Sequence, residues 1–76
     1  MNKPRRKTLQ VLLDQLAEIR DTLETIKNEE EECRNNMPEN LHGSERYEKA
    51  DSTCDDLYNA VSNLEEAAEN IEAAIE

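Results

Sequence analysis

Apolar residues recur at alternating steps of three and four along the first half of the chain. The pattern is interrupted only at Glu30, and its members are Leu9, Leu12, Leu16, Ile19, Leu23, Ile26 and Cys33. A heptad pattern sustained over more than three repeats is typical of a coiled-coil helix. Pro4 suits a first helical turn, and Pro38 disfavours helical geometry at the residue before it. We therefore expect a first helix over about residues 5–36.

The second half of the chain repeats this pattern without a break. Its members are Tyr47, Ala50, Cys54, Leu57, Val61, Leu64, Ala68, Ile71 and Ile75. Ser44 is a good N-cap, and Glu45 and Glu48 favour the positive end of a helix dipole. A second helix is expected from about residue 44 to residue 76.

Residues 37–43 form a short connector between these two helices. So short a connection makes consecutive helices antiparallel neighbours. Pro38 is expected to stop the first helix, Gly43 to let the backbone reverse, and Leu41 to fold back over the helix ends. The predicted fold is all-α: one domain over residues 1–76, an antiparallel two-helix coiled-coil hairpin.

The heptad pattern also suggests how the two helices align. In one register the numbers of paired residues add up to 80, which places Leu16 beside Leu64 and leaves both thiols free. A shift of one heptad, to 87, would place Cys33 opposite Cys54 but would leave too little room for the connector. We expect the first register.

Composition gives two opposing indications. A net charge of −10 and the absence of Phe favour disorder, whereas half of the chain is Ala, Glu, Lys, Leu and Arg, as in long helices. The periodicity decides for helices. No apolar run reaches the ~20 residues of a membrane span, the N-terminus lacks the features of a signal peptide, and two cysteines are too few for a disulfide framework. We expect a cytoplasmic protein that does not contact membranes.

A narrow two-helix core barely offsets the entropy of ordering the chain, so a second contact surface is expected. Small residues lie beside the second heptad pattern, Tyr58 lies on its opposite flank, and Val11 and Leu13 widen the first apolar face. The expected self-association face comprises Leu13, Thr53, Tyr58, Ala60, Ala67 and Ala74. We expect a homo-oligomer, most simply a dimer of hairpins forming a four-helix bundle. A different helical protein is an alternative partner, and the alanines could also serve only as good helix formers.

Charge is distributed unevenly along the chain. The basic residues Lys3, Arg5, Arg6 and Lys7 are expected to neutralise Glu69, Glu72 and Glu76 when the chain folds in half, so direct nucleic-acid binding is not expected. From Ala50 onward there is no Lys or Arg. The acidic face that an alternative partner could recognise comprises Asp51, Asp55, Asp56, Glu65, Glu66, Glu69 and Glu72. Such a face could imitate a nucleic acid and occupy the basic groove of a host protein.

Candidate chemistry is sparse. His42 has no neighbouring His, Cys or Asp and is expected to be an exposed connector residue. Cys33 and Cys54 stand at heptad positions, where a thiol packs as a small hydrophobe. The run Glu29–Glu32 lacks the inward Glu-x-x-His spacing of a di-metal bundle. We expect no catalytic, cofactor or metal site, and no enzyme.

The connector carries a resemblance to a known group. Its motif N-x-P-E-x-L-x-x-S-E-R resembles that of small, mostly uncharacterised acidic helical-hairpin proteins of gut Firmicutes and of their phages and other mobile elements. The matching residues are Asn36, Pro38, Glu39, Leu41, Ser44, Glu45 and Arg46. The resemblance implies a mobile-element context and supplies no activity. The expected function is a non-enzymatic protein–protein interaction module. The alternatives are the acidic mimic, which could inhibit a defence nuclease, and a disordered chain that folds on its partner.

Overall fold

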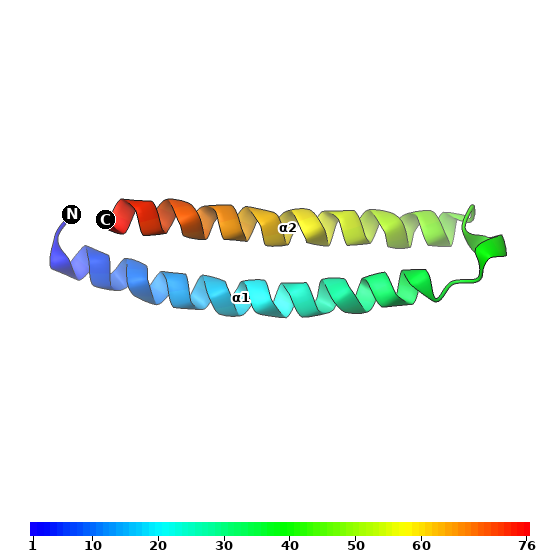
Figure 1. Ribbon diagram of the computed structural model, residues 1–76, viewed down its shortest axis with the longest axis horizontal. Helices are drawn as coiled ribbons and strands as arrows, with labels where there is room; N and C mark the ends of the chain where they lie inside the picture. The colour runs from blue at the N-terminus through cyan, green and yellow to red at the C-terminus, as the bar shows by residue number, and fades with distance from the viewer.

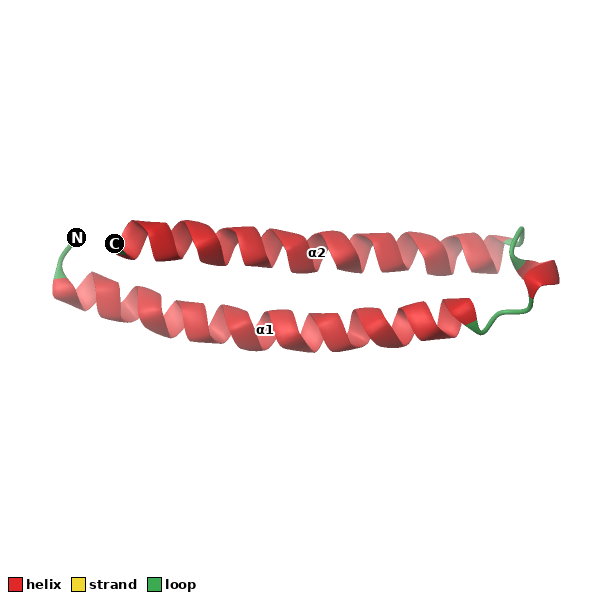
Figure 2. Ribbon diagram, in the orientation of Figure 1, coloured by secondary structure: helices red, strands yellow, loops and turns green.

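Two long antiparallel helices make up almost the whole molecule (Figure 1). The computed structural model describes all residues from 1 to 76. Helix α1 spans Lys3–Asn35 and helix α2 spans Glu45–Ile75, with a short 3-10 turn, η1, at Glu39–Leu41. There is no strand (Figure 2). The hairpin is a rod of 59 × 15 × 13 Å, which confirms the predicted all-α hairpin fold.

Both helices begin at a capping side chain. The Asn2 side-chain oxygen accepts a hydrogen bond of 2.9 Å from the backbone N–H of Arg5, so α1 begins two residues earlier than expected. Pro4 lies in the first turn, as predicted. The Ser44 hydroxyl accepts a hydrogen bond of 3.2 Å from the N–H of Tyr47, which confirms the predicted N-cap of α2. Each cap satisfies an N–H group that has no partner within the helix.

The connector reverses the chain without a left-handed residue. The expected role of Gly43 is wrong, since no residue has a positive φ. Pro38 is extended, with φ −58° and ψ 145°, and η1 supplies the turn. Two hydrogen bonds close this turn: the N–H of Leu41 donates to the Pro38 carbonyl at 2.9 Å, and the N–H of His42 donates to the Glu39 carbonyl at 3.1 Å. Leu41 stays exposed and does not fold back over the helices.

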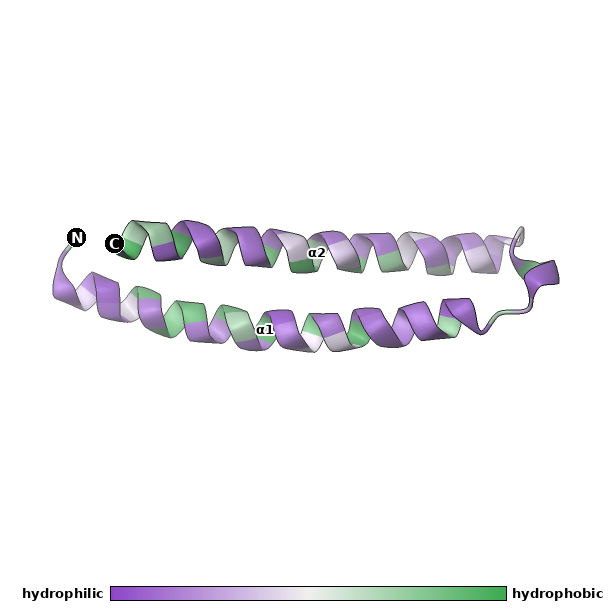
Figure 3. Ribbon diagram, in the orientation of Figure 1, coloured by the Kyte–Doolittle hydropathy of each residue, from purple (hydrophilic) through white to green (hydrophobic).

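The core is a single thin layer between the helices. Only Cys54, 3% exposed, and Val61, 6% exposed, are buried. The other heptad residues of α2 are half-buried, as its pattern predicted. Figure 3 shows that the hydrophobic part of α1 is the half nearer the chain termini, whereas the half nearer the connector is mostly hydrophilic. The burial that holds the hairpin closed is therefore modest.

Helix α1 is rotated about its axis relative to the prediction. Leu9, Leu16 and Leu23 are half-buried as expected, but the positions that alternate with them are Leu13, Arg20, Lys27 and Arg34. The residues predicted at those positions, Leu12, Ile19, Ile26 and Cys33, are exposed. Consecutive helical residues are separated by about 100° of rotation, so a step of four in place of three changes which flank of α1 faces α2.

The observed register differs from both registers considered above. Three contacts cross between the helices at heptad spacing: Arg20 with Glu65 at 3.5 Å, Lys27 with the Tyr58 ring at 5.7 Å, and Arg34 with Asp51 at 2.8 Å. In each pair the residue numbers add up to 85, not to 80 or 87.

The register also determines where the basic N-terminal cluster lies. With this register the C-terminal Glu76 lies level with Leu9, so the first turn of α1 extends past the end of α2 (Figure 1). The expected ion pairs between the basic cluster and the C-terminal acids are absent, and that prediction is wrong. The four basic residues, all exposed, are Lys3, Arg5, Arg6 and Lys7.

Candidate interaction surfaces

The rod has two long sides that differ in chemistry. We call one the ladder side, because the three cross-helix contacts lie along it: Arg20–Glu65, Lys27–Tyr58 and Arg34–Asp51. The heptad spacing of these contacts places them one above another along the rod. The ladder side therefore ties α1 to α2 with polar and aromatic groups.

The two arginines of the ladder are held by carboxylates. Arg34 donates a hydrogen bond of 2.8 Å to Asp51, and its side chain is 22% exposed. Desolvation lowers the pKa of Arg34, but the hydrogen bond to Asp51 and nearby charges outweigh it, so that the pKa is raised. Arg20 donates to Asp21 at 2.6 Å as well as to Glu65, and the charge of Asp21 is the largest cause that raises the pKa of Arg20. Both arginines therefore stay charged, and both form ion pairs within the hairpin.

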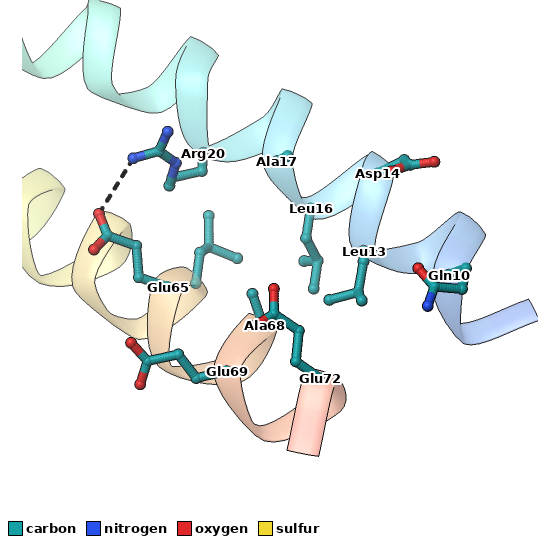
Figure 4. Close-up of a pocket in the computed structure, with 11 residues that line it drawn as sticks. Gln10, Leu13, Asp14, Leu16, Ala17, Arg20, Glu65, Ala68, Glu69 and Glu72 are labelled. Carbon is teal, nitrogen blue, oxygen red and sulfur yellow. Dashed lines mark hydrogen bonds and ion pairs between the residues drawn. The ribbon is translucent and has the colours of Figure 1, made fainter. Parts of the chain in front are cut away.

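A shallow groove opens on the ladder side near the chain termini (Figure 4). Leu13, Leu16 and Ala68 give it an apolar floor, and Arg20 reaches across one end of it toward Glu65. Carboxylates of both helices stand around its edge: Asp14, Glu65, Glu69 and Glu72. These four carboxylates are exposed, so water reaches each of them.

The residues of the expected acidic face do not share one surface. Glu65, Glu69 and Glu72 meet at the groove, and Asp51 lies in the ladder. The remaining members, Asp55, Asp56 and Glu66, are exposed along α2. The charges of Asp51 and Glu65 are partly neutralised by Arg34 and Arg20.

The residues of the expected self-association face are divided between the two sides. Tyr58 lies on the ladder side beneath the Lys27 amine, and Leu13, which the pattern placed outside the core, lines the groove there instead. Thr53, Ala60 and Ala67 are half-buried along the opposite flank of α2, and Ala74, at the same heptad position, is exposed. Only these four lie together.

Sequence reasoning missed the residues that accompany them. Because Leu12, Ile19 and Ile26 lie on the flank of α1 away from the ladder, they share a side of the rod with Ala60 and Ala67. Ile19 is 51% exposed, and Leu12 and Ile26 are each 41% exposed. The heptad spacing of the three aliphatics is the sequence signal for this surface, and the same spacing equally fits the intramolecular core.

The residues between these apolar groups carry no charge. On α1 they are threonines and a glutamine, and on α2 they are asparagines. We call this surface the neutral face, and it comprises Thr8, Leu12, Gln15, Ile19, Thr22, Ile26, Ala60, Asn63, Ala67, Asn70 and Ala74. In a chain of which 37% is charged, such a surface is unusual.

The two cysteines and the histidine differ in their burial and contacts. Cys54 is a free thiol in the core, as predicted, and burial raises its pKa. Cys33 is also free but exposed, so its predicted core packing is wrong, because it lies on the outer flank of α1. His42 is exposed and stacks on Tyr47 with ring centroids 4.3 Å apart, while its Nε2 lies 3.1 Å from the carbonyl of Met37. The imidazole therefore contacts residues at both ends of the connector.

Two further properties bear on possible ligands and surroundings. No group of three or more His, Cys, Asp or Glu side chains is arranged to hold a metal ion. Neither helix has a stretch that is long and apolar enough to span a lipid bilayer. Comparison of the chain with protein-family models, with curated proteins and with solved structures found no match.

Proposed function

We propose that the chain is a non-enzymatic protein–protein interaction module that acts by self-association, with two hairpins forming a four-helix bundle. The observation that supports it most is the imbalance between buried and exposed apolar groups. Only Cys54 and Val61 are buried, whereas α1 leaves several large aliphatic side chains largely exposed. Covering them would supply the burial that a two-helix core lacks.

The ladder side supports an interaction role over a catalytic one. Its groove is open to water, and its arginine is already paired with carboxylates. Catalytic sites gain their electrostatic effects by excluding water. A cytoplasmic location and an origin in a phage or another mobile element complete the proposal.

Sedimentation equilibrium over a wide range of protein concentration tests it. We expect the mass of a dimer at high concentration, and a loss of the helical circular-dichroism signal as dilution separates the two hairpins. A monomeric mass at every concentration, with full helicity, would contradict self-association. A chain that is unfolded at every concentration would support the alternative of folding on a partner.

The second candidate is an acidic mimic of a nucleic acid. It is supported by the exposed acids of α2, which carries no Lys or Arg after Lys49. It is weakened by the two arginines of α1 that pair with Asp51 and Glu65. For a mimic, reversing the charges of Asp55, Glu66 and Glu69 would abolish capture of a basic host protein while dimer mass stays unchanged. High salt would have the same effect, because such binding depends on screenable charge.

A further inference from the structure

We propose that the neutral face is the dimer interface, and that it binds a second copy of this chain in the opposite direction, with the two connectors at opposite ends. This inference rests on the proposed self-association and specifies its surface and orientation. It replaces Leu13 and Tyr58, which lie on the ladder side, with three exposed aliphatics of α1: Leu12, Ile19 and Ile26.

The first argument is the match between the two helices on this face. With the observed register, residues whose numbers add up to about 85 lie level across the hairpin. Each exposed aliphatic of α1 therefore stands beside a small residue of α2: Leu12 beside Ala74, Ile19 beside Ala67, and Ile26 beside Ala60. Small side chains on α2 let a second hairpin approach closely, and the aliphatics of α1 supply the apolar area that the contact buries.

The second argument is the absence of charge. Two chains that each carry a net charge of −10 repel one another. The neutral face is the surface on which they can meet without bringing acids together. Its hydroxyl groups are also prepared for burial, because Thr8 donates to the Pro4 carbonyl at 3.0 Å and Thr22 donates to the Glu18 carbonyl at 3.1 Å. Covering these hydroxyls leaves no donor without a partner.

The third argument fixes the direction. Two neighbouring stripes of α1 make up its part of the neutral face: Arg5 precedes Leu12 by one heptad in the aliphatic stripe, and Glu29 follows Thr22 by one heptad in the polar stripe. These two exposed side chains are about 36 Å apart along the helix, and neither has an ion-pair partner in the hairpin. When a second α1 lies antiparallel across the first, with the two-fold axis between Gln15 and Ile19, Arg5 of each copy lies level with Glu29 of the other.

The opposite-end arrangement also brings the basic N-terminal cluster near the acidic run of the second copy. The alternative, with both connectors at one end, would bring the acidic runs Glu29–Glu32 of two chains together and leave the basic clusters together at the other end. Like charges in contact are destabilising, so charge complementarity selects the opposite-end dimer.

The interface is tested first by mass measurements on matched variants. We expect Ile19→Glu to weaken dimerisation at least tenfold, because it places a carboxylate near the two-fold axis. Val11→Glu is the control, since Val11 is 52% exposed and lies off the neutral face, and its mass should match the wild type. Both substitutions are at exposed sites of the hairpin, so neither disturbs its core, and circular dichroism of each should be helical at protein concentrations high enough to restore the dimer.

The direction is tested by exchanging charges. Arg5→Glu alone and Glu29→Arg alone should each weaken dimerisation by about tenfold, because each creates two repulsive pairs across the two-fold axis. Mixing the two single variants should restore dimerisation as a heterodimer, and combining both changes in one chain should restore the homodimer. Arg5→Glu also places an acid at the positive end of the α1 dipole, so a loss of dimer would not reflect a weaker helix.

The outcomes separate the inference from the function on which it rests. A monomeric wild type would overturn self-association itself. A dimeric wild type whose Ile19→Glu variant stays dimeric would overturn the neutral face and leave self-association intact. Loss of the dimer in Ile19→Glu without rescue in the charge mixture would overturn the opposite-end direction.

Discussion

A valine on each helix allows the thin core to be tested quantitatively. Val61 is 6% exposed at the centre of the core, and Val11 is 52% exposed on the outer flank of α1. Replacing Val61 with Ala removes two buried carbon groups, which contributes a loss of about 1.6 kcal/mol at ~0.8 kcal/mol each. Alanine recovers about 0.5 kcal/mol through its higher helix propensity. The expected net destabilisation is about 1 kcal/mol.

The same change at Val11 serves as the matched control. About half of that side chain is already in water, so the lost burial of about 0.8 kcal/mol nearly cancels the gain in propensity. Urea denaturation followed by circular dichroism, with all variants at one protein concentration, should place Val61→Ala about 1 kcal/mol below Val11→Ala. That difference corresponds to a midpoint about 4–8 °C lower on heating. Equal losses, or a larger loss for Val11→Ala, would refute the assignment of Val61 to the core and of Val11 to the surface.

Four further predictions concern the connector and the thiols. Gly43→Ala should stabilise the hairpin by about 0.4–1 kcal/mol in urea denaturation, because φ is not positive there and an added Cβ would meet nothing within 4 Å. Ser44→Ala should destabilise it by about 1 kcal/mol in the same assay, since the N–H of Tyr47 loses its capping oxygen. Cys33 should react rapidly with a thiol reagent and Cys54 only when the hairpin opens, and mass spectrometry of the labelled peptides would show the order. Because burial raises the pKa of Cys54 above its ordinary value of 9.0, its contribution to stability is complete below about pH 9 and is lost as the pH rises through the folded-state pKa. Denaturation midpoints should therefore fall at alkaline pH in the wild type and fall less in Cys54→Ala.

The hairpin itself was predictable because its determinants are local. Pro38 ends one helix, Ser44 caps the next, and the heptad pattern of α2 corresponds to its half-buried positions. Each of these signals acts within a few residues of its own position, so it can be recognised without knowing what lies across the rod.

The rotation of α1 was not predictable in the same way. Leucines occupy both position 12 and position 13, so periodicity fits the core with either one facing inward. The observed rotation brings Arg20 and Arg34 within reach of carboxylates of α2. These contacts link residues far apart in the sequence, and the heptad pattern does not encode them. The rotation and the register together determine which residues make up the neutral face.

The connector influences how the rod forms as well as how it ends. Its turn is closed by short hydrogen bonds, including one of 2.6 Å from the Ser44 hydroxyl to the Leu41 carbonyl, and by the stacking of His42 on Tyr47. Residues next to this turn meet after the shortest loop closure, and each later layer adds to one already in place. From loop closure alone we expect the hairpin to close from the connector toward the termini, so that the layers that form last are those over which the partner's α1 would lie.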